Sequence, residues 1–80
     1  MLTSTYSDRF LDVRGQATPM MIMTVAKAMK QLGKGQILAV CAKDNDAKRS
    51  ITAWAAKTGN SVLEMTERHG LLTFYIQRAS

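Results

Sequence analysis

The 80-residue sequence contains one cysteine, one histidine and one proline, and it has no long apolar run. A single thiol, that of Cys41, excludes an internal disulfide framework and any metal site built from several thiolates. No stretch approaches the roughly 20 apolar residues that cross a bilayer, so we expect no membrane span. Residues 1–7 lack a basic segment followed by an apolar run, which predicts no secretory signal and a cytoplasmic protein.

Residue types that commonly act in catalysis or in metal binding are also scarce. One histidine, one cysteine and six acidic residues supply no recognisable triad, metal cluster or phosphate loop. We therefore expect a carrier or binding protein with no cofactor and no metal, and not an independent enzyme. The net charge of +5 favours acidic protein surfaces or nucleic acid as partners. The basic residues are dispersed and the aromatic residues few, which gives an RNA-binding sheet little support.

A chain of this length has room for one small domain with one core. We expect residues 1–80 to form it, with residues 1–5 frayed. Alternating or continuous apolar residues predict four strands, and apolar residues at steps of three and four predict two helices. The strands are expected over residues 6–13, 36–42, 61–68 and 71–78, and the helices over residues 18–32 and from residues 44–46 to about residue 58.

This order of elements predicts an α+β fold, a two-layer βαβαββ sandwich. A strand, helix and strand in succession form a right-handed crossover between parallel neighbours, whereas the short last link makes a hairpin. The result is a four-stranded mixed sheet with both helices on one face. The opposite face, partly open to solvent or a partner, would hold Ile37, Ala39, Cys41, Thr73, Tyr75 and Gln77.

The start of the first helix is strongly marked. Thr18 is predicted to be its N-cap and Pro19 its first residue, where a missing N–H has no effect. Gly33 is predicted to stop this helix. Met20 and Met23 are expected at the edges of the buried stripe, where flexible thioethers could form a docking surface. The buried stripe is predicted to contain Ile22, Val25, Ala26, Met29 and Leu32, and Trp54 is predicted to anchor the second helix in the core.

The chain resembles the TusA/SirA/YedF-like sulfur-carrier family along nearly its whole length. The resemblance rests on the run Leu11-Asp12-Val13-Arg14-Gly15, on Pro19 at a helix start, and on Gly35, Trp54 and Gly70 before the last strand. It implies a βαβαββ fold and a place in a sulfur relay. In that family a Cys-Pro-x-Pro motif opens the first helix, and its cysteine receives a persulfide sulfur from a donor protein and passes it to an acceptor.

The motif falls on residues 18–21 when Asp12, Arg14 and Gly15 are aligned, so Thr18 replaces the cysteine and Met21 the second proline. The resemblance implies that Thr18, Pro19 and Met21 are site positions and that Asp12, Arg14 and Gly15 form the scaffold around them. A hydroxyl cannot carry a persulfide, so no catalytic residue is carried over.

Three functions remain open from the sequence. The first is a partner-binding or regulatory module of the relay that lacks the persulfide-accepting thiol, with a sulfur donor or acceptor protein as its partner. The second is a sulfur carrier that uses Cys41, although a cysteine within a strand lacks the positive environment of a helix start. The third is an RNA-binding module, which the net charge alone suggests.

Overall fold

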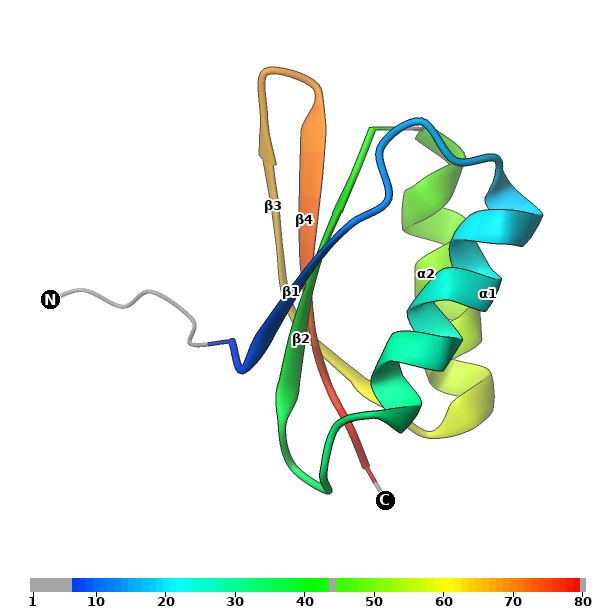
Figure 1. Ribbon diagram of the computed structural model, residues 1–80. Helices are drawn as coiled ribbons and strands as arrows, with labels where there is room; N and C mark the ends of the chain where they lie inside the picture. The colour runs from blue at the N-terminus through cyan, green and yellow to red at the C-terminus, as the bar shows by residue number, and fades with distance from the viewer. Residues whose placement is uncertain (1–6, 44, 80) are drawn as a thin grey trace, which may run out of the picture.

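The computed structural model describes residues 7–43 and 45–79. Its elements are β1 (Arg9–Asp12), α1 (Thr18–Lys30), β2 (Ile37–Ala42), α2 (Asn45–Thr58), β3 (Ser61–Arg68) and β4 (Leu71–Gln77). Both helices lie on one face of the sheet (Figure 1). The predicted α+β two-layer sandwich is confirmed, while the expectation for residues 1–5 and that for residue 44 at the start of the second helix lie outside the described residues.

The sheet has the strand order β1-β2-β4-β3, and β1 and β2 are parallel, as predicted. The pair β2–β4 and the hairpin β3–β4 are antiparallel. The hairpin turns at His69 and Gly70, which both have positive φ, as a two-residue turn of the primed type requires. Because β1 and β2 are parallel neighbours, the loops after their carboxyl ends start from the same edge of the sheet.

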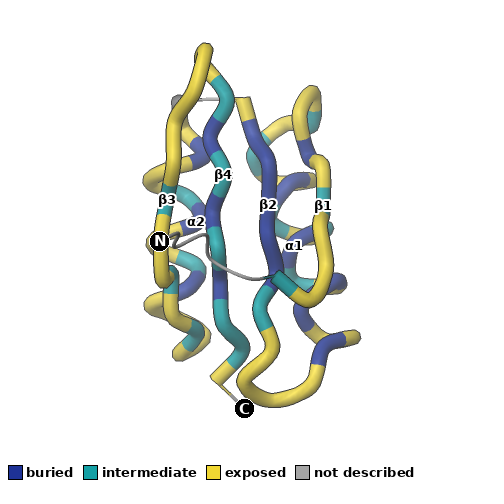
Figure 2. Tube along the Cα trace, turned by 90° about the vertical axis from the view of Figure 1, so that its left-hand side faces the viewer, coloured by how far each residue is buried: buried dark blue, intermediate teal, exposed yellow. Residues whose placement is uncertain are grey.

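The core lies between the sheet and the helices and takes alternate residues of the central strands. Val40 of β2 and Phe74 of β4 point towards the helical layer, where Val25 and Ile51 meet them. Figure 2 shows β2 buried along most of its length, with β1 and β3 as exposed edges. Burial on both faces explains the continuous apolar sequence of β2. Trp54 is half-buried and packs against this core.

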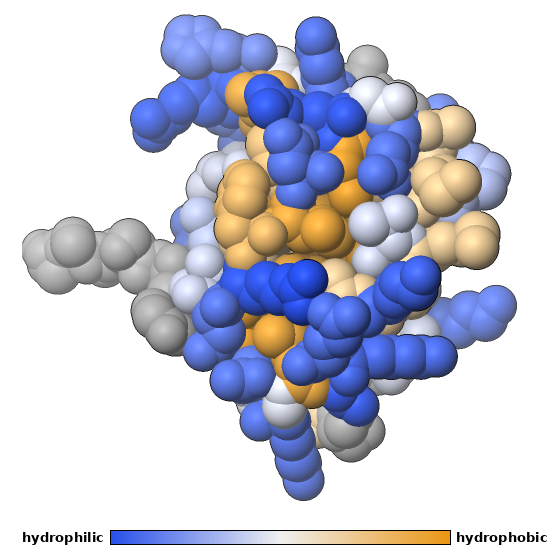
Figure 3. All heavy atoms as spheres, viewed as in Figure 1, coloured by the Kyte–Doolittle hydropathy of each residue, from blue (hydrophilic) through white to orange (hydrophobic). Residues whose placement is uncertain are grey.

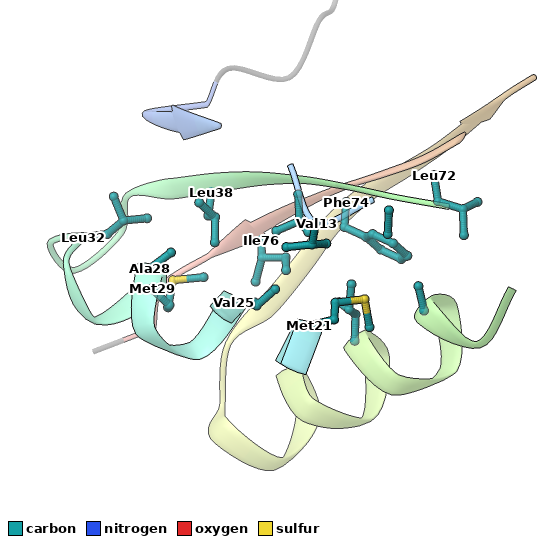
Figure 4. Packing of buried hydrophobic residues seen from close by; sticks show 14 residues of the cluster. Val13, Met21, Val25, Ala28, Met29, Leu32, Leu38, Leu72, Phe74 and Ile76 are labelled. Carbon is teal, nitrogen blue, oxygen red and sulfur yellow. The ribbon is translucent and has the colours of Figure 1, made fainter. Parts of the chain in front are cut away.

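The buried face of α1 differs from the predicted stripe. Val25 and Met29 are buried as predicted, but Met21 and Ala28 are buried too, whereas Ile22 and Ala26 are only half-buried. Figure 4 shows Met21 pointing from α1 towards Phe74 of β4. The sequence could not decide this rotation, because stripes through residues 21 and 22 share the apolar positions that follow.

The end of α1 also corrects the prediction, because Gly33 does not stop the helix. α1 ends at Lys30, and Arg78 closes it from the end of the chain. Its Nη1 lies 3.3 Å from the Met29 carbonyl oxygen and 3.1 Å from that of Lys30, and it also donates to the Leu32 carbonyl. A cation at this end satisfies carbonyls that have no partner in the helix and complements the helix dipole.

The second helix ends at Thr58, as predicted, and Gly59 follows it. This glycine has a φ of +80°, and the Asn60 amide donates to the Ala55 carbonyl at 2.9 Å, which closes the last turn. Among the residues that the structure describes, neither helix combines the length and the apolar character needed to cross a membrane.

Two neighbouring methionines test the orientation of α1. Met21 is 1% exposed and Met20 is 55% exposed. Met21→Ala should therefore lower the free energy of unfolding by about 2–5 kcal/mol, because it removes buried thioether and methylene groups and leaves a cavity. Met20→Ala, the matched control, should change it by about 0.5 kcal/mol or less. Urea denaturation measures both, and equal losses would contradict this orientation.

Candidate functional site

The loop between β1 and α1 begins with an ion pair between Asp12 and Arg14. The Asp12 carboxylate accepts hydrogen bonds from Nε of Arg14 at 2.9 Å and from Nη2 at 2.8 Å. It also accepts the backbone N–H of Arg14 at 3.0 Å. The bidentate pair and the local turn together fix the direction in which the chain leaves the sheet.

The same contacts shift the protonation of both side chains. The hydrogen bonds from the Arg14 guanidinium, followed by that from its amide, hold the pKa of Asp12 below its ordinary value of 3.8. The Asp12 carboxylate in turn raises the pKa of Arg14. The pair is exposed to solvent, so we assign it an orienting role in the loop.

Gly15 and Gln16 bring the chain back over α1. Gly15 has a φ of +90°, a conformation that side chains disfavour, which explains the glycine. The Thr24 hydroxyl lies 2.9 Å from the Gln16 side-chain oxygen and 2.9 Å from the Met20 carbonyl oxygen. Gln16 thus ties the loop to the second turn of α1. Sequence reasoning missed this contact because nothing in the local pattern relates residue 16 to residue 24.

The first turn of α1 corrects the predicted capping. The N-cap is Ala17, whose carbonyl accepts the Met21 amide at 2.8 Å, and no side chain caps the helix. Thr18 is instead the first helical residue and Pro19 the second. The prediction was wrong because threonine before proline matches the N-cap pattern even when the helix starts one residue earlier. The helix start has no acidic residue in its first turn, so its positive end is not neutralised there.

A shallow hollow of about 410 Å³ lies beside this helix start. It is lined by Gly15, Gln16 and Ala17 from the loop and by Lys43, which follows β2. Lys43 was not among the predicted site residues. The signal that could have found it is the parallel pairing of β1 and β2, because the residues that follow parallel neighbours meet at one edge of the sheet.

The positions of the predicted motif divide between surface and core. Pro19 is exposed and Thr18 is half-buried, whereas Met21 is buried in the core. Met20 and Met23, predicted at the edge of the buried stripe, are 55% and 66% exposed. Figure 3 shows moderately hydrophobic side chains over the first half of α1 and hydrophilic ones towards its carboxyl end. An exposed apolar surface therefore adjoins the start of α1.

Cys41 lies on the other face of the sheet. Its side chain is 8% exposed, and it borders a hollow of about 500 Å³ whose other lining residues come from β3, β4 and their turn. In the β1–β2 register Cys41 is opposite Asp12, and its carbonyl accepts the Val13 amide at 2.9 Å. The structure thus brings Cys41 close to the scaffold residues, but the sheet separates it from the helix start.

Within residues 7–43 and 45–79, no group of three or more His, Cys, Asp and Glu side chains is arranged to hold a metal ion. The chemistry that the helix start offers is that of free amides, a lysine and exposed methionines. Such a surface can bind an anionic or apolar group, but it holds no nucleophile.

Comparison with known proteins identifies the family. A family model described as Sulfurtransferase TusA matches residues 9–78. The chain belongs to the TusA family. It is 46% identical over 72 residues to YrkI of Bacillus subtilis, named a candidate sulfur carrier protein, and the match covers 90% of this chain and 96% of YrkI.

One further relative supports this family, and one solved structure shares the fold. It is 32% identical over 72 residues to the sulfur carrier protein TusA of Allochromatium vinosum, with 90% of this chain and 95% of that protein covered. A SirA-like protein of Desulfitobacterium hafniense has the same fold, with a TM-score of 0.79 and 22% identity, over 90% of this chain and 99% of that one. The recognised family and fold are confirmed, and these names lend no support to the RNA-binding alternative.

The ion pair predicts a measurable titration. A carbon-detected NMR titration should give Asp12 a pKa below 3.8, and Arg14→Gln should return it towards that value. The Asp12 carboxyl group binds its proton less tightly in the folded chain than in the unfolded chain. The ion pair therefore stabilises the fold fully above about pH 3.8, and this stabilisation is lost as the pH falls through the pKa of Asp12 in the folded chain. Arg68→Gln, at an arginine of the β3–β4 hairpin, is the control and should leave the titration unchanged.

Proposed function

We propose that this TusA-family chain works in the sulfur relay as a partner-binding or regulatory module and carries no persulfide at the start of α1. One observation supports this most directly. The first residue of α1, where the family motif has its acceptor cysteine, is Thr18. The rest of the helix start, with the Asp12–Arg14 pair and the Gly15 turn, has the form of a presenting scaffold.

The chemistry of sulfur transfer explains why this replacement matters. A thiolate attacks the outer sulfur of a donor persulfide, a new sulfur–sulfur bond forms, and the donor leaves as a thiolate. A threonine hydroxyl keeps its proton at neutral pH unless a base removes it. No acidic residue stands in the first turn of α1 to remove this proton.

The exposed side chains at the start of α1 are suited to binding a protein partner. Met20 and Met23 expose flexible thioethers one turn apart, and methionine surfaces adapt to different partners. Pro19 fixes the backbone of the first turn, so little conformational freedom is lost there on binding. The partner under this proposal is a donor or acceptor protein of the relay, met in the cytoplasm, where thiols are kept reduced.

The remaining alternative within the family is transfer through Cys41. Nucleophilic transfer needs an accessible thiolate at a favourable electrostatic position. Cys41 is 8% exposed and lies within β2, and both helices lie on the opposite face of the sheet (Figure 1). These features favour a structural role for its side chain, and the experiments below separate the two functions.

Sulfur loading tests the proposal directly. The protein, incubated with a cysteine desulfurase and cysteine and then analysed by intact-mass spectrometry, should gain no sulfur atom. An adduct of one sulfur mapped to Cys41 would overturn the proposal, and Cys41→Ala would confirm the assignment by removing that adduct.

Restoring the thiol provides the complementary test. In Thr18→Cys the new thiol stands at the positive end of α1, where the dipole and free amides lower a thiol pKa, so it should react with iodoacetamide at least about tenfold faster than Cys41 at pH 7. This variant should also gain one sulfur from the desulfurase. Equal alkylation rates of the two thiols would show that the helix start no longer activates a cysteine.

A further inference from the structure

The excess of positive charge comes from one stretch of the sequence. Residues 17–58, which form both helices, β2 and the loops between them, contain seven of the eleven lysines and arginines but only two of the six acidic residues. The remaining residues contain four of each charge, so they are neutral overall. β2 itself has no charged residue. The whole excess of +5 therefore comes from the stretch that contains both helices, and it favours a partner with a negative surface.

The side of α2 that faces away from the core has a shallow hollow. It has a volume of about 570 Å³ and is lined by Lys48, Arg49, Thr52, Ala53 and Ala56. These residues recur at steps of three and four, opposite the buried face formed by Ala47, Ile51 and Ala55. Two cations thus stand at the amino-terminal end of the hollow, and three short side chains form its floor.

We propose that this hollow binds an acidic, amphipathic helix of a protein partner. From Arg49 to Ala56 the hollow spans about 11 Å, or two helical turns, so a second helix has two turns of α2 to pack against. A floor of short side chains lets a second helix approach closely, and its carboxylates can reach Lys48 and Arg49. This surface is separate from the helix start of α1, and the inference does not rest on the proposed function.

The composition of the hollow selects protein over nucleic acid. Alanine methyl groups bury well against apolar side chains but offer nothing to a hydrated phosphate. No aromatic residue lines the hollow, so unpaired bases have no ring on which to stack. Nucleic acid is therefore an outcome that the experiment can distinguish.

The probe is a synthetic amphipathic peptide of about 18 residues, long enough to form a helix in isolation, with leucine and alanine on one side and glutamate on its flanks. Titrated into the isotope-labelled 80-residue protein, it should shift the NMR signals of residues 46–57. Arg49→Glu should weaken binding about fivefold, since one attraction becomes a repulsion. Ala53→Leu, which fills the hollow without changing the charge, should weaken it by a similar factor.

Matched variants exclude general charge attraction. Lys34→Glu makes the same change of net charge in the loop after α1 and should leave peptide binding within about twofold. Loss of binding in Lys34→Glu equal to that in Arg49→Glu, or unchanged binding in Ala53→Leu, would overturn the proposal. Tighter binding of an oligouridine than of the peptide to residues 46–57 would assign this face to nucleic acid instead.

The same titration shows whether the peptide binds at α2 or at the start of α1. A double variant, Met20→Ser with Met23→Ser, should leave peptide binding at α2 unchanged, because both methionines belong to α1 and neither lines the hollow. Spectral shifts centred on Met20 and Met23 instead of α2 would overturn the α2 site, while leaving the proposed function intact.

Discussion

The parallel pairing of β1 with β2 is the constraint on which the rest of the structure depends. It requires a crossover, and α1 provides it; it also places the loop after β1 and Lys43 after β2 at the same edge of the sheet. With β4 against its other edge, β2 becomes the buried centre of the fold, and its side chains are apolar or small on both faces. One pairing thus sets the position of the core, of the helix start and of the buried thiol.

The fold could be predicted almost completely from the sequence, because hydrophobic periodicity and turn residues determined each element. The strand and helix positions, the parallel and antiparallel pairs and the half-buried Trp54 agree with the predictions. The errors occurred where two patterns are degenerate. Threonine before proline is compatible with the N-cap or with the first helical position. A helix rotated by one position keeps most of its apolar stripe, so Met21 was left out of the predicted buried set.

The site was less predictable, because its contacts join residues distant in sequence. Asp12, Arg14 and Gly15 were predicted to form a scaffold by resemblance alone; the structure shows the hydrogen bonds and the φ value of this loop, and the scaffold role stays a prediction. The link between Gln16 and Thr24, and the cap that Arg78 places on α1, have no local signature. Nor could the sequence show that Cys41, distant along the chain from Asp12, is its direct neighbour in the sheet.

Two side-chain contacts that restrain α1 have a consequence for recognition. Gln16 ties the preceding loop to the second turn of the helix, and Arg78 binds carbonyls at its carboxyl end, so α1 is held to the loop before it and to the residue that follows β4. A rigid helix has already given up the conformational entropy that many docking segments lose on association. A partner that approaches α1 therefore meets a surface of fixed shape, and the two proteins can associate as rigid bodies, with any adjustment limited to side-chain rotamers.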